Sequence, residues 1–203
     1  MSEQMDKVVK ETYRYFYVDG LVETAVGLLF ALIGLVLAGW AGFEQGSWLL
    51  KTAVIILPIL IIGGTFGIKW LVGSLKERIT YPRTGYVAYR PGEPNNKRWL
   101  LPLFAALLVL LMFLFPAWLN KMAFVQGALL AFILGIIGYR VALARFYLSA
   151  GIAFAIGLLA TLFVANEVMG SAITFGGTGV LMLLMGLIVF TTYLRQHPIP
   201  EIS

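Results

Sequence analysis

Two carboxylates stand at the start of the first long apolar run, and their spacing suits an intramembrane charge cluster. Asp19 and Glu23 are four residues apart, so on a helix they share one face, about 6 Å apart along the axis. An ionised side chain at the edge of a bilayer needs a partner of opposite charge. Lys69, near the end of the second apolar run, has the right sign. The sequence therefore predicts a cluster of Asp19, Glu23 and Lys69, which either responds to protons or cations or fixes the packing of helices.

A second set of side chains with binding chemistry lies in the polar segment of residues 75–98. β-forming residues flank Pro82 and Gly85, an order that is typical of a short β-hairpin. Arginine binds phosphate through two parallel hydrogen bonds, and tyrosine suits the membrane–water interface. We therefore predict a binding site for anionic lipid headgroups or a protein partner, formed by Arg78, Tyr81, Arg83, Tyr86, Tyr89 and Arg90. The alternative is a basic loop that only fixes the topology.

The TYPRTGYV core of this segment, residues 80–87, resembles a loop of uncharacterised multi-pass membrane proteins of prokaryotes. The resemblance implies that the segment is a defined element and that the protein resides in a prokaryotic inner membrane. It implies no activity.

The elements that must position these residues are apolar helices. Of the 203 residues, 60% are hydrophobic and 12% charged, whereas soluble domains carry about 25% charged residues. Mean hydropathy is +0.89. The sequence predicts one all-α membrane domain over residues 1–203, with helical spans close to the ~20 residues that a bilayer requires. The six predicted transmembrane helices cover residues 20–43, 48–72, 99–119, 122–141, 146–165 and 171–194.

Small residues and a faint repeat indicate how these helices pack. Gly20, Gly27 and Gly34 recur every seven residues, which places them along one helical face that we expect to meet another helix closely. FYVDGLVETAVGLL, from Phe16, and FYLSAGIAFAIGLL, from Phe146, share aromatic and small positions in one register. This repeat favours an architecture of three helical hairpins.

Basic residues fall mainly on one side of the predicted spans. Twelve Lys and Arg residues lie in arms and loops of that side, and two, Lys51 and Lys121, lie on the other. By the positive-inside rule both termini and residues 75–98 are predicted to be cytoplasmic. Topology and headgroup contact account for the net charge of +5, so we expect no nucleic-acid binding.

Catalytic chemistry has few candidate residues in this chain. There is no cysteine and one histidine, and no span holds a nucleophile–base pair or a zinc motif. We therefore expect no enzyme activity, no cofactor and no metal site. The lead hypothesis is a scaffold or accessory subunit that binds anionic lipid or a protein partner through its basic loop, with homo-oligomerisation left open. The alternative is a small transporter or channel that uses Glu23 and the helix containing Pro58, where proline interrupts the backbone hydrogen bonds.

Overall fold

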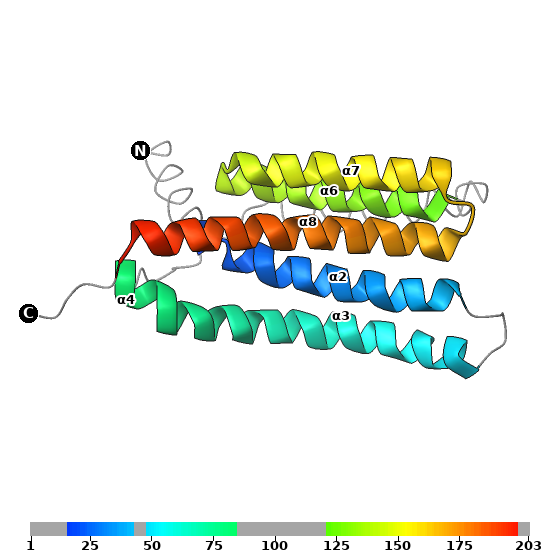
Figure 1. Ribbon diagram of the computed structural model, residues 1–203, viewed down its shortest axis with the longest axis horizontal. Coiled ribbons are helices and arrows are strands. Elements are labelled where there is room, and N and C mark those ends of the chain that lie inside the picture. Colours follow the sequence, from blue (N-terminus) through cyan, green and yellow to red (C-terminus); the bar gives the residue numbers. More distant parts are fainter. Residues whose placement is uncertain (1–15, 43–47, 85–120, 199–203) are drawn as a thin grey trace, which may run out of the picture.

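The computed structural model describes residues 16–42, 48–84 and 121–198, which form helices and the turns beside them (Figure 1). Five helical segments of this part of the chain are long and apolar enough to cross a membrane, which marks the chain as a multi-pass membrane protein. The long helices are α2 (Leu21–Ala41), α3 (Trp48–Leu75), α6 (Met122–Val141), α7 (Ala144–Phe163) and α8 (Glu167–Gln196). A π-helical turn, η1 (Lys76–Thr80), and a short helix, α4 (Tyr81–Thr84), follow α3 directly.

These helices agree with five of the six predicted spans. α6 has the predicted bounds, α7 begins at residue 144 rather than 146, and α8 covers residues 167–196 rather than 171–194. The remaining predicted span, residues 99–119, lies outside the described residues. α4 and the beginning of α6, which stand on either side of that span in the sequence, lie at opposite ends of the bundle (Figure 1).

The predicted β-hairpin is wrong over its first half. Residues 78–84 continue the helix as part of η1 and α4, and no strand is present in the described ranges. The physical reason is tertiary: Lys76 and Thr80, one helical turn apart, are both buried, so this turn is anchored as a helix despite its β-forming residues. Pro82 lies where the helix continues from η1 into α4, so its missing N–H leaves one carbonyl of the preceding turn without a backbone donor. The second half of the predicted hairpin, residues 85–98, falls outside the described residues.

α2 and α8 pack along the predicted glycine seam, which confirms that this face of α2 meets protein. A Cβ atom added at Gly27 would lie 2.4 Å from the backbone nitrogen of Leu183 and 2.8 Å from the carbonyl oxygen of Gly179. At Gly34 it would lie 2.3 Å from Cα of Gly176. Backbone atoms cannot yield as a flexible side chain does, so any larger residue at these positions would push the two helices apart.

α6 and α7 form a second close pair through Gly127 and Gly157. A Cβ atom added at either glycine would lie 2.8 Å from Cα of the other. Gly157 aligns with Gly27 in the internal repeat, so both copies place the same glycine at a helix crossing. α8 contacts α2 on one side and the α6–α7 pair on the other, and α3 covers the opposite side of α2 (Figure 1).

Candidate functional site

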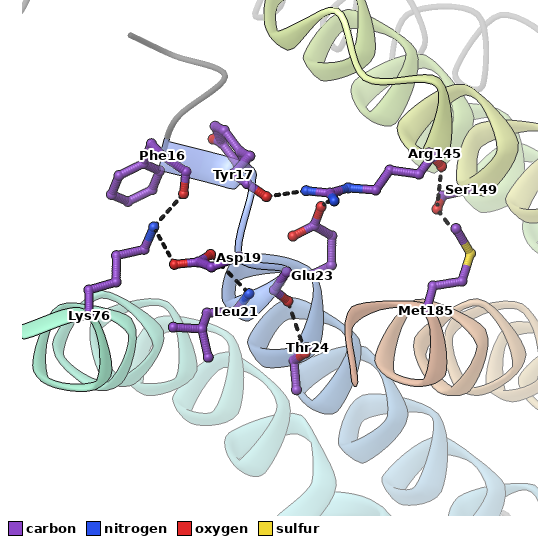
Figure 2. A network of polar contacts seen from close by, with 11 residues as sticks. Phe16, Tyr17, Asp19, Leu21, Glu23, Thr24, Lys76, Arg145, Ser149 and Met185 are labelled. Carbon is purple, nitrogen blue, oxygen red and sulfur yellow. Dashed lines mark hydrogen bonds and ion pairs between the residues drawn. The ribbon is translucent and has the colours of Figure 1, made fainter. Parts of the chain in front are cut away.

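Charged side chains from three helices meet at the end of the bundle where α2 begins, α3 ends and α7 begins (Figure 2). The chain reaches α2 through Gly20, whose φ of 72° is a left-handed conformation that suits glycine. Asp19, just before it, accepts a hydrogen bond from the backbone N–H of Leu21 at 3.2 Å through Oδ1. This turn aims Asp19 Oδ2 at α3 and places Glu23 on the side of α7.

The first ion pair joins Asp19 to Lys76 on η1. Lys76 Nζ lies 3.0 Å from Asp19 Oδ2, and the two side chains are 3% and 1% exposed. Thr80 donates a second hydrogen bond to Asp19 Oδ2 at 3.1 Å. Lys76 also donates to the backbone carbonyl of Phe16, and its Nζ lies 3.9 Å from the centre of the Phe16 ring. With the Leu21 N–H bond to Oδ1, five interactions therefore satisfy the lysine and the carboxylate inside the protein.

The second ion pair joins Glu23 to Arg145 in the first turn of α7. Arg145 Nε lies 2.6 Å from Glu23 Oε1, while Arg145 Nη2 donates to the backbone carbonyl of Tyr17. Glu23 Oε2 is buried and has no hydrogen-bond partner among the described residues. The carbonyls of two consecutive residues, Phe16 and Tyr17, are thus held by cations from two different helices (Figure 2).

No protein-family model, curated protein or solved structure matches this chain. Lys76, which is buried, and Arg145, which is partly exposed, each contact one carboxylate and one backbone carbonyl. This arrangement fixes the segment before α2 between α3 and α7. We call this set of residues the charge clamp: Asp19, Glu23, Lys76, Thr80 and Arg145, with the carbonyls of Phe16 and Tyr17.

The predicted pairing of the two acids with Lys69 is wrong. Lys69 is exposed on α3, and the cations that reach the acids are Lys76 and Arg145. Lys76 lies seven residues beyond Lys69, about 10 Å farther along the helix, which brings it level with the beginning of α2. The spacing of the two acids predicts that they lie at one end of α2, whereas their partners depend on how far each helix extends past its neighbour.

The described residues of the predicted lipid or partner site do not all face the same surroundings. Arg78 is exposed on η1, and Tyr81 is half-buried at the start of α4. Arg83 instead turns inward along the end of α8, where Nη1 donates to the carbonyls of His197 at 2.8 Å and Leu194 at 3.3 Å. A guanidinium at the carboxyl end of a helix satisfies carbonyls that lack intrahelical partners. The other members of the predicted site, Tyr86, Tyr89 and Arg90, lie outside the described residues.

The features proposed for transport lie far apart along the bundle. Pro58 is exposed on α3, eighteen residues before Lys76, or about 27 Å along the axis. The cluster of glycines in the first half of α8 includes two, Gly176 and Gly179, that contact α2 at the seam described above. Close packing of α8 on α2 therefore accounts for the presence of these glycines.

Sequence reasoning missed Lys76, Thr80 and Arg145 as members of the site. Lys76 and Thr80 are four residues apart, a spacing that would place both side chains on one face if the segment is helical. Arg145 stands immediately before the second copy of the internal repeat. Its pairing with Glu23 had no signal, because the repeat does not say which helices touch.

Proposed function

We propose that the protein is a non-catalytic scaffold or accessory subunit of a prokaryotic inner membrane, which acts through its basic, cytoplasmic end. The observation that carries this proposal is the position of the cations. Six described Lys and Arg residues lie at the end of the bundle that holds the charge clamp: Lys76, Arg78, Arg83, Arg140, Arg145 and Arg195. Lys51 and Lys121 lie toward the opposite end. This asymmetry supports a cytoplasmic placement of the basic end.

Internal contacts divide these six cations into two groups. Lys76, Arg83 and Arg145 are engaged with carboxylates or carbonyls of the chain. The other three are exposed and make no ion pair or hydrogen bond within the described residues: Arg78, Arg140 and Arg195. Exposed guanidinium groups at a membrane surface suit phosphate or carboxylate groups of lipids and partner proteins. Arg78, beside the helical turn that holds the clamp, is the residue that we expect to contact a partner.

A charge reversal at Arg78 tests the proposed role. The protein and its Arg78→Glu variant are extracted from native cells in nanodiscs, and the proteins and lipids that accompany them are measured by mass spectrometry. We expect the variant to recover at most about one tenth of the specific partner that wild type recovers. The reason is that a glutamate facing an anionic group of the partner weakens the binding free energy by more than ~1.4 kcal/mol. Lys121→Glu, at the opposite end, is the matched control and should leave recovery unchanged. Equal recovery with Arg78→Glu would remove the scaffold hypothesis.

A small transporter is the second candidate function, and the unpartnered oxygen of Glu23 favours it. A buried carboxylate with a free acceptor offers a site for a proton or a cation. The pairing of Glu23 with Arg145 weighs against this role, as does the distance from Pro58. The test is flux of ions and small solutes in proteoliposomes with wild type and Glu23→Gln. A flux that falls to background in the variant, but not in Lys69→Gln, would support transport.

A further inference from the structure

The outer side of α3 carries a stripe of large apolar side chains that ends in a lysine. α3 packs on α2 at the edge of the described bundle (Figure 1). Four apolar side chains on its other side are between 60% and 68% exposed: Ile55, Ile59, Ile62 and Phe66. Successive members are four, three and four residues apart, and Lys69 follows three residues later, so all five share one face of the helix. We call these five residues the outer stripe.

Lys69 lies within the hydrocarbon region of the bilayer. α2 is 21 residues long, or about 31 Å, which matches the ~30 Å thickness of the hydrocarbon core. Lys76 pairs with Asp19, two residues before α2 begins. Lys69 is seven residues closer than Lys76 to the middle of α3. Its backbone therefore lies about 7 Å inside the hydrocarbon boundary.

The ammonium group of Lys69 meets no anion of the described chain. Lys69 is exposed, and it makes no ion pair or hydrogen bond within the described residues. The Cα–Cβ bonds of a helix tilt toward its N-terminus, and α3 begins at the end of the bundle opposite the charge clamp (Figure 1). The side chain therefore starts toward the bilayer centre and must bend back to reach the nearer headgroups. A lysine at this depth is costly unless an anion meets it.

The acids of the sequence decide where such an anion can come from. Glu23 is the only acid in the six predicted spans, and Arg145 already pairs with it. A second copy of the chain therefore offers no free carboxylate at the depth of Lys69. A symmetric pair of α3 helices would instead bring two Lys69 side chains together, and like charges repel. Charge complementarity thus favours a different protein, with an acid inside one of its membrane spans.

We propose that the outer stripe docks one transmembrane helix of a partner protein, whose aspartate or glutamate pairs with Lys69. A repeat of 3.5 residues suits two helices that cross at about +20°. A Cβ atom added at Gly73, one turn beyond Lys69, would meet nothing within 4 Å, so the partner backbone can approach the lysine closely. The inference rests on the proposed function only in that an accessory subunit has a partner, and the outer stripe is separate from Arg78 and from the charge clamp.

A synthetic transmembrane peptide tests the charge pairing. The full chain carries a donor dye at Glu77→Cys, an exposed position, and is reconstituted in phosphatidylcholine liposomes at pH 8. The acceptor-labelled probes are two leucine–alanine helices, one with a glutamate at the depth of Lys69 and one with a glutamine there. We expect energy transfer to show that the chain binds the glutamate peptide about fivefold more tightly, a factor typical of polar contacts between membrane helices.

Matched variants make the result specific to the outer stripe. Lys69→Gln should abolish the preference for glutamate and keep the unfolding temperature of wild type, because Lys69 is exposed. Lys121→Gln, at the opposite end, should retain the preference. Phe66→Ala should weaken binding of both peptides about threefold, whereas Leu35→Ala, which truncates a side chain 71% exposed on α2, should weaken neither. Equal binding of the two peptides to wild type would overturn the proposal, as would a preference that survives in Lys69→Gln or equal losses from Phe66→Ala and Leu35→Ala.

Crosslinking in native cells identifies the occupant of the stripe. p-Benzoylphenylalanine is placed at the position of Ile62, and the peptide that it captures on illumination is sequenced by mass spectrometry. We expect an apolar segment of another protein that contains Asp or Glu, with a yield that falls about fivefold when Lys69→Gln is added. Adducts with lipid alone, or with a second copy of this chain, would overturn the proposal. Peptide binding in liposomes depends neither on membrane orientation nor on Arg78, so it can fail while the scaffold role stands, and the reverse.

Discussion

Asp19 and Lys76 form the most completely buried ion pair among the described residues. Its contribution to stability depends on the cost of leaving either charge buried without the other. Removing the carboxylate leaves an ammonium group without water and without an anion. We expect Asp19→Asn to lower the free energy of unfolding by about 3–5 kcal/mol. The measurement is unfolding in mixed micelles, followed by circular dichroism.

The double variant Asp19→Asn with Lys76→Met tests whether the loss comes from the pair. Removing both charges should restore most of the lost stability, since the apolar methionine needs no partner. Lys69→Met is the matched control on the same helix, because Lys69 is exposed; we expect a change within about 0.5 kcal/mol. A larger loss of stability from Lys69→Met than from Asp19→Asn would contradict the charge clamp as described.

Arg83 connects two helices through one side chain, which reaches from α4 to the end of α8. We expect Arg83→Ala to lower stability by about 1–3 kcal/mol, because carbonyls of Leu194 and His197 lose a charged donor. The effect should be local, with faster amide hydrogen exchange over the last turn of α8 only. Arg78→Ala is the control, since Arg78 is exposed and makes no such contact. Exchange that is equal in both variants would mean that Arg83 does not hold the end of α8.

Two glycines in long helices allow the effect of close helix packing on stability to be distinguished from the intrinsic helix propensity of the residue. We expect Gly27→Ala to destabilise the protein by about 1–3 kcal/mol, because the new methyl group would press on the backbone of α8. Gly63→Ala on α3 meets no atom within 4 Å, so it should be neutral or stabilising by up to about 1 kcal/mol. The two unfolding temperatures, measured in the same detergent, decide the matter. Equal shifts would show that the α2–α8 seam does not require glycine.

The arrangement of helices also limits where the clamp can act. α2 lies between α3 and α8, and the segment before α2 reaches both η1 and α7. The clamp therefore ties α3 to α7, which stand on different sides of α2 (Figure 1). This gives the charges a packing role even if no substrate ever reaches them.

For the whole molecule, the absence of cysteine in the sequence allows a direct test of orientation. Glu77 and Ala165 are both exposed and lie at opposite ends of the bundle. We expect a membrane-impermeant maleimide to label Ala165→Cys in intact cells and to label Glu77→Cys only after the cells are opened, because we propose that the basic end is cytoplasmic. Labelling of Glu77→Cys from outside would invert the orientation and remove the basis of the scaffold proposal.

The sequence by itself predicts those features of the protein that depend on neighbouring residues of one segment. A span is recognised by its own length and hydropathy, so the bounds of α6 followed from its sequence. The seven-residue spacing of Gly27 and Gly34 likewise marked a packing face before any partner was known. The acids Asp19 and Glu23 stood out because charge is rare and costly in such segments.

Which side chains from distant parts of the sequence pair with one another is decided only by the tertiary structure. Many cations were available to each acid, and only the relative extension of α3 and α7 past α2 selected Lys76 and Arg145 over Lys69. The same holds for residues 78–84, whose β-forming side chains favoured a hairpin until burial of Lys76 and Thr80 fixed them as helix. Pattern and hydropathy act within a few turns of one helix, whereas pairing across the bundle depends on geometry that no single segment contains.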